Sequence, residues 1–218
     1  MDLCSGATRS TSKGERFMTW DEHADGWDEN PAVRAYSEAA FASLVRLDED
    51  GRLNLDGARI LDFGCGTGLL GERLSKRAKV VVAIDTSVEM IHVLKDKMKK
   101  RGLDNVRGIA KPIDAAMAAD ASLFEEPFDI VTCSSVCAFL EDYPSMARTL
   151  SQLLRPGGAF VQWDWELDPT SDEPFGLTRS QIEEALNTVG LRDVLVDVAF
   201  DVEFEGEHMR PLLGFGIR

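Results

Sequence analysis

Cysteine is scarce in this sequence, and none of it is arranged in pairs. Cys4, Cys65, Cys133 and Cys137 contain no C-x-x-C motif, so neither a disulfide framework nor a zinc site is indicated. Long apolar runs are missing too. The run from Lys79 to Ile84 is far shorter than the roughly 20 residues of a membrane span, and the amino terminus lacks a signal-peptide stretch. These absences predict a soluble, cytoplasmic protein with reduced thiols.

Positive charge is also in short supply. The 218 residues carry 38 acidic and 24 basic side chains, which gives a formal net charge of −14. Nucleic-acid binding depends on clustered Lys and Arg, whereas the basic run here lies at the end of a predicted helix, where cations complement the helix dipole. Its members are Lys95, Lys97, Lys99, Lys100 and Arg101. We therefore expect a small-molecule partner, with no nucleic acid and no membrane; the oligomeric state stays open.

Strand and helix patterns alternate through the middle of the chain. Residues 1–17 lack apolar periodicity and predict a flexible tail, and residues 18–218 predict a single domain that begins with a helical cover over 18–50. The expected strands are Arg59 to Phe63, Val80 to Ile84, Val106 to Ala110, Phe128 to Cys133 and Gly158 to Trp163. The expected helices between them are Leu69 to Arg77, Thr86 to about Arg101, Ala115 to Leu123 and Tyr143 to Leu154. This alternation is typical of an α/β fold with a parallel sheet covered on both faces.

The amino-terminal cover carries two helix-start signals. Thr19 to Glu22 matches a capping box, which predicts a short helix through about Trp27. Asn30 followed by Pro31 predicts the start of a second helix, which the spacing of apolar residues extends to about Leu47.

The carboxyl-terminal part changes to a period of two. A capping box at Thr178 to Gln181 first predicts a helix that ends near Gly190. The alternation over residues 194–204 then predicts one long strand. Residues 208–218 can return antiparallel to it, with Pro211 at an unpaired position because proline has no N–H to donate.

A glycine-rich turn follows the first expected strand. Gly64, Gly66 and Gly68 lack the β-carbons that would keep a ligand away from the backbone. In a doubly wound sheet, such a loop at the carboxyl end of the first strand is where a nucleotide-like cofactor binds. Asp85 closes the second strand 17 residues beyond Gly68, and a carboxylate there can accept hydrogen bonds from both ribose hydroxyls. Loop and carboxylate together predict an adenosine-containing cofactor.

The same loop fits a dinucleotide less well. The G-x-G-x-x-G fingerprint, counted from Gly64, requires a third glycine at the position of Leu69. A nicotinamide-dependent oxidoreductase is therefore kept as an alternative rather than as the main prediction.

The motifs resemble those of a known family, the class I S-adenosylmethionine-dependent methyltransferases, and within it the enzymes related to the ubiquinone and menaquinone C-methylases. Trp20-Asp21 and Trp27-Asp28 look like the aromatic-Asp pair at the amino terminus of that family. The other segments that carry the resemblance are Leu61-Asp62-Phe63-Gly64-Cys65-Gly66-Thr67-Gly68, Ile84-Asp85-Thr86-Ser87 with Met90, Phe128-Asp129-Ile130-Val131, and Leu153-Leu154-Arg155-Pro156-Gly157-Gly158.

The resemblance implies a Rossmann-like seven-stranded sheet of order 3-2-1-4-5-7-6, with the last strand antiparallel. It also implies S-adenosyl-L-methionine as the cofactor. The backbone of Gly64, Cys65 and Gly66 would approach its methionine part, and Thr67 belongs to the same binding loop. Asp62 would orient this loop and the amino group of the cofactor.

The remaining cofactor contacts are implied in the same way. Asp85 would hold the ribose, and Thr86 and Met90 would flank the adenine. After the third strand the family has an acidic residue beside the adenine amino group. Asp114 is the candidate, although it lies about two residues later than usual, after Lys111-Pro112.

Two further positions are implied to face the cofactor and the substrate: Cys133 and Ser134, at the end of the fourth strand. Trp27 and Tyr36 are candidates for a lid over the cofactor, but the packing of an amphipathic helix against the sheet would use the same aromatics.

The predicted reaction is the transfer of a methyl group to a small-molecule acceptor. Cys133-Ser134-Ser135-Val136 stands where amino-methylating enzymes of the DNA adenine class have an Asn-Pro-Pro-Tyr type sequence, which disfavours that class. No residue identifies itself as a catalytic base. The candidates are His23, Asp164 and Glu166. A methyltransferase-like protein that binds the cofactor and acts as a non-catalytic regulatory partner is the other alternative.

Overall fold

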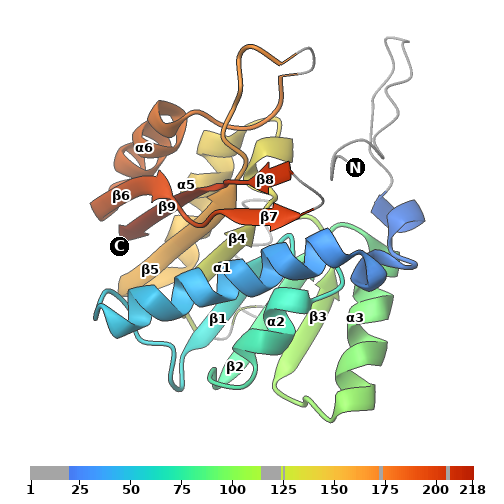
Figure 1. The fold of residues 1–218 in the computed structure, drawn as a ribbon. Helices are drawn as coiled ribbons and strands as arrows, with labels where there is room; N and C mark the ends of the chain where they lie inside the picture. Colours follow the sequence, from blue (N-terminus) through green and yellow to red (C-terminus); the bar gives the residue numbers. More distant parts are fainter. Residues whose placement is uncertain (1–19, 114–123, 125, 172–173, 205–206) are drawn as a thin grey trace.

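A computed structural model describes residues 20–113, 124, 126–171, 174–204 and 207–218. Its centre is a seven-stranded sheet of order β3-β2-β1-β4-β5-β9-β6 (Figure 1). The strands of this sheet are β1 Arg59–Phe63, β2 Val80–Asp85, β3 Val106–Ala110, β4 Phe128–Ser134, β5 Leu154–Asp164, β6 Arg192–Val198 and β9 Leu212–Ile217. Strands β3, β2, β1, β4 and β5 are parallel, and β9 pairs antiparallel with both β5 and β6. The predicted strand order is thus confirmed, with β9 as the seventh strand.

Helices cover both faces of the sheet (Figure 1). They are α1 Pro31–Glu49, α2 Leu69–Leu74, α3 Val88–Arg101, α5 Tyr143–Leu153 and α6 Arg179–Thr188. Alternate residues of each strand point to opposite faces. On β1, Ile60 therefore packs with α1 and α2, whereas Leu61 packs with α5 and α6. None of these helices, in the part of the chain that the structure describes, has the length and apolar character needed to cross a membrane.

The amino-terminal cover differs from its prediction. Instead of one helix through Trp27, the described part has two short 3-10 helices, η1 Trp20–His23 and η2 Trp27–Glu29. Gly26 separates them with a φ of 76°, a left-handed conformation that ends any helical run. The second start signal is confirmed, because Asn30 Oδ1 accepts a hydrogen bond of 2.9 Å from the Ala32 N–H and Pro31 begins α1.

The predicted long strand over residues 194–204 is interrupted. Strand β6 ends at Val198, and β7 Val202–Phe204 pairs instead with β8 Glu207–Met209 in a separate two-stranded sheet. Phe200, in the gap, packs its ring 5.2 Å from that of Tyr36 on α1, which takes the chain off the main sheet. Pro211 lies between β8 and β9, outside both strands, so no strand requires an N–H from it, as expected. Its carbonyl accepts from the Ala199 N–H at 2.9 Å.

Helix α3 begins at Val88, two residues after the expected start at Thr86. The side chain of Ser87, rather than that of Thr86, accepts from the Met90 N–H at 3.1 Å and caps the helix. The predicted helix Ala115 to Leu123 lies outside the described residues.

Candidate active site

A cleft of about 580 Å³ opens at the carboxyl ends of β1, β2 and β4. In this sheet the chain runs outward from β1 to β2 and β3 on one side, and from β4 to β5 on the other. Ligands of doubly wound sheets bind where the strand order reverses in this way. The volume lies within the usual range of small-molecule pockets, roughly 300–1,000 Å³.

The glycine loop forms the floor of this cleft. The Gly64 N–H and the Cys65 N–H both donate to the Ile84 carbonyl, at 2.8 and 3.1 Å, so the loop folds back over the end of β2. A β-carbon on Gly66 would approach nothing closer than Trp27 Nε1 at 3.9 Å, so the backbone here is open to the cleft. Gly64 has a different role, because a β-carbon there would lie 2.4 Å from Val136 Cγ2. The lack of a side chain at Gly64 thus permits the close approach of the glycine loop to the loop after β4.

Asp85 connects the glycine loop to the start of α3. Its Oδ2 accepts from the Gly66 N–H at 2.8 Å, and its Oδ1 accepts from the Ser87 N–H at 2.9 Å. Burial raises the pKa of this carboxyl, and the backbone hydrogen bonds oppose the rise. Each carboxylate oxygen keeps a second lone pair, so the side chain can still accept from the two hydroxyls of a ribose. Thr86 and Met90 line the cleft beside it, as does the exposed Lys111.

Asp62 holds an unsatisfied acceptor inside the cleft. Register pairs it with Thr132 on β4, whose hydroxyl donates to Asp62 Oδ1 at 2.8 Å. Asp62 Oδ2 is buried without a hydrogen-bond partner among the described residues. Burial raises the pKa of the carboxyl to about 7; the Thr132 bond lowers it and the nearby Asp85 raises it further. A buried, unpaired acceptor is costly, and a cationic donor such as a primary ammonium would satisfy it.

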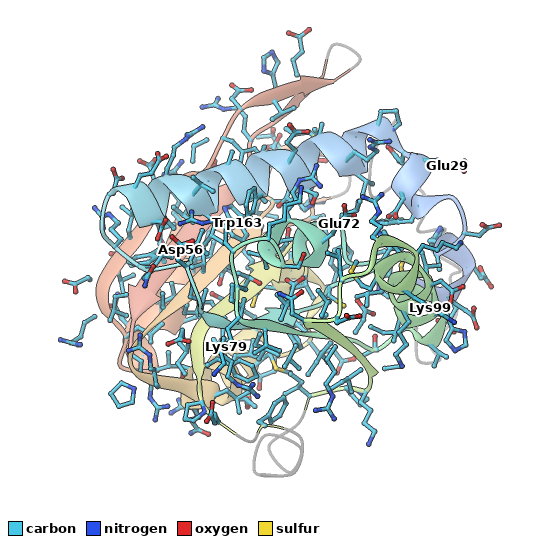
Figure 2. The ribbon with its side chains drawn as sticks, turned by 90° about the horizontal axis from the view of Figure 1, so that it is seen from below. Glu29, Asp56, Glu72, Lys79, Lys99 and Trp163 are labelled. Carbon is cyan, nitrogen blue, oxygen red and sulfur yellow. The ribbon has the colours of Figure 1, made fainter. Side chains whose placement is uncertain are left out.

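Two aspartates of the amino-terminal cover form hydrogen bonds with the glycine loop and with the start of α3. Asp21 Oδ1 accepts from the Ser87 hydroxyl at 2.5 Å, at the start of α3. Asp28 accepts from the Thr67 hydroxyl in the glycine loop and also pairs with Lys97 on α3. Figure 2 shows the result: the segment that carries Glu29 lies at the end of α1 and next to α3. These bonds hold Trp27, a cleft-lining residue, over Gly66.

Aromatic side chains surround the other half of the cleft. Trp20, Tyr36, Phe139 and Trp165 line it, and they come from η1, α1, the short helix η3 Cys137–Phe139 and the end of β5. Ser134 lines the cleft, and Ser135 beside it adopts a left-handed φ of 54°. Trp163, by contrast, is core: it lies beneath α1 (Figure 2), and its Nε1–H donates to the Ser43 hydroxyl at 3.1 Å.

Cys133 lies elsewhere than expected. Side chains alternate along β4, and because Thr132 points toward Asp62, Cys133 points to the opposite face. There it is fully buried in the core with Cys137. Its side chain therefore does not face the cleft, which corrects that expectation. Asp114 lies outside the described residues.

The three candidate bases do not line the cleft either. His23 stands edge-on to Trp20 with ring centroids 6.1 Å apart, and Glu166 forms an ion pair with Arg179 at 3.0 Å. Asp164 is fully buried behind η3, where it accepts from the backbone N–H groups of Cys137 and Ala138 at 3.1 and 3.0 Å. Burial raises its pKa to about 7. Through these two hydrogen bonds Asp164 holds η3, whose Phe139 lines the cleft.

Sequence reasoning missed several residues of the site. Val136 and Phe139 line the cleft in the segment that follows β4. Ligands of such sheets bind at the carboxyl ends of the strands, so their position after a central strand was the available signal. Ser37 had no such signal; its hydroxyl lines the cleft, buried and without a partner among the described residues. Within the same residues, no group of His, Cys, Asp and Glu side chains could hold a metal ion.

The sequence comparisons agree with this geometry. Residues 60–158 match the family model of a methyltransferase domain. The chain is 35% identical over 104 residues to an uncharacterised methyltransferase of Schizosaccharomyces pombe, covering 47% of this chain and 37% of that protein. It is 36% identical over 118 residues to a ubiquinone biosynthesis O-methyltransferase of Xanthomonas oryzae pv. oryzae, covering 52% and 46%. The chain thus spans less than half the length of either relative.

Solved structures extend the likeness to nearly the whole chain. A magnesium protoporphyrin IX methyltransferase from Synechocystis, with bound S-adenosylmethionine, matches with a TM-score of 0.64 at 16% identity, covering 94% of this chain and 86% of that one. An S-adenosylmethionine-dependent methyltransferase from Clostridium acetobutylicum matches with a TM-score of 0.66 at 19% identity, covering 91% and 98%. Residues 60–158 thus match a methyltransferase domain. The chain as a whole has the fold of the class I S-adenosylmethionine-dependent methyltransferases.

Proposed function

We propose that the cleft binds S-adenosyl-L-methionine and that the protein transfers its methyl group to a small-molecule acceptor. The observation that carries this proposal is Asp62 Oδ2, a buried acceptor without a partner among the described residues, on a side chain that lines the cleft beside the glycine loop. The cofactor has a primary ammonium on its methionine part, and that group satisfies this acceptor. The relatives and structural neighbours that are named methyltransferases support the same reading.

Other residues fit the rest of the cofactor. Gly66 leaves its backbone open for the methionine part, and Asp85 has free lone pairs for the ribose hydroxyls. Thr86 and Met90 line the cleft beyond Asp85, where the adenine would lie. Leu69 occupies the position of the third glycine of a dinucleotide site, and this favours S-adenosylmethionine over a nicotinamide cofactor.

The protein's main contribution to the reaction is alignment. When bound, the sulfonium supplies an activated methyl group. Asp62 and Asp85 fix the two ends of the cofactor, so that the methyl carbon lies in the half of the cleft that faces the acceptor. Trp27, held by the bonds of Asp28, covers the floor and excludes water.

A small acceptor in the cytoplasm completes the proposal. The cleft of about 580 Å³ suits a cofactor with a small partner, and the net charge of −14 disfavours nucleic acid. The described cysteines, Cys65, Cys133 and Cys137, are all free thiols, which supports a reducing compartment.

Calorimetric titration of S-adenosylmethionine and of S-adenosylhomocysteine into the full chain tests the proposal. We expect one site per chain, and weaker binding by about 1.5–3 kcal/mol in Asp85→Asn, the scale of a charged hydrogen bond. Asp104→Asn is the matched control, because Asp104 is an exposed aspartate in the turn between α3 and β3. Binding of a nicotinamide dinucleotide in place of S-adenosylmethionine would refute the proposal. Cofactor binding without turnover of any acceptor would favour the regulatory alternative.

A further inference from the structure

We infer that the acceptor is a planar aromatic molecule, held between two aromatic walls, whose nucleophilic atom becomes reactive without a general base among the described residues that line the cleft. The inference rests on the proposed methyl transfer and adds the chemical class of the acceptor. It is based on the aromatic rings that line the cleft and on the hydrogen bonds that their polar atoms form within the protein.

The first wall joins the amino-terminal cover to the loop after β4. Trp20 and Phe139 have ring centroids 5.1 Å apart and planes at 87°, an edge-to-face contact. Phe175 supports Phe139 from behind, with centroids 4.7 Å apart. Because Trp20 also contacts Trp27 edge-on at 6.2 Å, this wall continues from the floor above the glycine loop into the acceptor half.

The second wall is formed by α1 and the end of β5. Tyr36 and Trp165 have ring centroids 5.3 Å apart, and Phe200 supports Tyr36. Tyr36 and Trp165 line the same cleft as Trp20 and Phe139. Aromatic rings contact other rings in preferred offset and edge-to-face arrangements, with a gain beyond simple burial. Two such walls therefore select a flat ring over a saturated one of similar size.

The polar atoms of the second wall are used inside the protein. The Tyr36 hydroxyl donates to the Trp163 carbonyl at 3.1 Å, and the Trp165 Nε1–H donates to the Ser135 hydroxyl at 2.9 Å. The left-handed φ of 54° at Ser135 places this hydroxyl in a conformation that L-residues seldom adopt. These bonds leave the carbon surfaces of the two rings to face a ligand.

The acceptor half also offers little for proton abstraction. Among its described lining residues, the titratable side chains are Tyr36 and Glu141. Burial raises the pKa of Tyr36 well above its ordinary value, and its proton is held by the Trp163 carbonyl. Glu141 is exposed to water at the rim. The other titratable lining residues lie on the cofactor side, at or just after the ends of β1, β2 and β3: Asp62, Cys65, Asp85 and Lys111.

The nucleophile therefore loses its proton to water before the transfer. An acidic phenol or an aromatic thiol does so near neutral pH. Its lone pair then forms the new bond to the methyl carbon, the carbon–sulfur bond of the sulfonium breaks, and the electron pair goes to sulfur. The products are the methylated aromatic molecule and neutral S-adenosylhomocysteine, so charge and atoms balance.

The test compares matched acceptors with the full chain and S-adenosylmethionine. Formation of S-adenosylhomocysteine is measured with 4-nitrophenol against phenol. Binding to the protein loaded with S-adenosylhomocysteine is measured for phenol against cyclohexanol, which are both neutral near pH 7. We expect the Kd of phenol to be at least about tenfold lower than that of its saturated analogue. We also expect kcat/KM for 4-nitrophenol to exceed that for phenol by about tenfold or more, because without a base the ionised fraction of the acceptor sets the rate.

Variants of the walls supply a second readout. Trp165→Leu and Phe139→Leu should each raise the KM for thiophenol about three- to tenfold. The Kd for S-adenosylhomocysteine should stay within twofold, on the order of measurement error. Phe41→Leu on α1 is the control for a partly buried aromatic outside the cleft. Circular dichroism checks that each variant is folded.

The outcomes separate the two proposals. Absence of cofactor binding would refute the methyltransferase itself. Cofactor binding with equal Kd values for phenol and cyclohexanol would refute only the aromatic acceptor. So would failure of thiophenol and phenol to bind to the protein loaded with S-adenosylhomocysteine. Equal rates for phenol and 4-nitrophenol would show that a protein base assists the reaction.

Discussion

Asp62→Asn is the substitution whose effect the structure defines most sharply. The change keeps the shape of the side chain and replaces a carboxylate with a neutral amide. In the protein, the Thr132 hydroxyl donates to Asp62 Oδ1 at 2.8 Å, and Oδ2 has no partner among the described residues. The proposed function pairs Oδ2 with the cofactor ammonium. Loss of one charged hydrogen bond costs about 1.5–3 kcal/mol, so the Kd for S-adenosylmethionine should rise about 10- to 150-fold at pH 8.

The pH dependence of cofactor binding should differ between the native protein and Asp62→Asn. Burial raises the pKa of Asp62 to about 7, so the carboxyl is protonated below that pH in the empty cleft. A protonated acid must lose its proton before it can pair with an ammonium. The affinity of the native protein should therefore fall about tenfold for each pH unit below 7, whereas that of Asp62→Asn should not depend on this group.

The stability of the ligand-free protein changes in the opposite direction. Because the folded state binds the proton more tightly than the unfolded state, the free energy of unfolding falls as pH rises from 3.8 to about 7. Asp62→Asn lacks this contribution. The melting temperature of the native protein relative to the variant should thus decrease across that range.

The assay is calorimetric titration of the native protein, Asp62→Asn and the control Asp104→Asn between pH 5.5 and 8.5. The two Kd values should differ most at pH 8 and converge toward pH 5.5, while the control follows the native protein. Parallel pH profiles for the native protein and Asp62→Asn would refute the reasoning. So would equally tight binding by both at pH 8.

Three further substitutions, one of them with a matched control, test the supports of the cleft. Asp28→Asn removes the carboxylate that fastens the amino-terminal cover, and stopped-flow measurement should show cofactor release about five- to tenfold faster; an unchanged rate would contradict the role of the cover. Gly64→Ala combines a φ of 67° with a contact of 2.4 Å, and should lower the melting temperature by about 4 °C or more. Gly57→Ala is the control for backbone strain alone, because Gly57 has a φ of 74° and open space around it. An equal loss of melting temperature in the two variants would contradict a role for the contact between Gly64 and Val136. Asp164→Asn weakens the support of η3, so the acceptor KM should rise in steady-state assays while the cofactor Kd holds; loss of kcat alone would instead indicate a base.

The central sheet could be predicted from the sequence because its signals are local. Strand β1, the glycine loop and Asp85 follow one another within a short segment, and the structure places them together. The end of β6 had no such signal. The period of two continues through Phe200, and the contact of Phe200 with Tyr36, far away in the sequence, is what interrupts the strand.

The candidate site was predictable to a similar extent. Asp62 and Asp85 follow from the motif, but the missing partner of Asp62 Oδ2 appears only when β1 and β4 are side by side. Cys133 was placed on the wrong face, although its alternation with Thr132 was the available signal. The first aromatic wall could not be predicted, because Trp20 and Phe139 meet only through the fold. Tyr36 of the second wall was a candidate from the sequence.

A crystal structure of the protein grown with S-adenosylhomocysteine tests the central claim most directly. The account predicts the ligand in the cleft, its ammonium within hydrogen-bonding distance of Asp62 Oδ2 and its ribose hydroxyls on Asp85. An empty cleft at saturating ligand would contradict the account, as would a ligand whose ammonium lies away from Asp62.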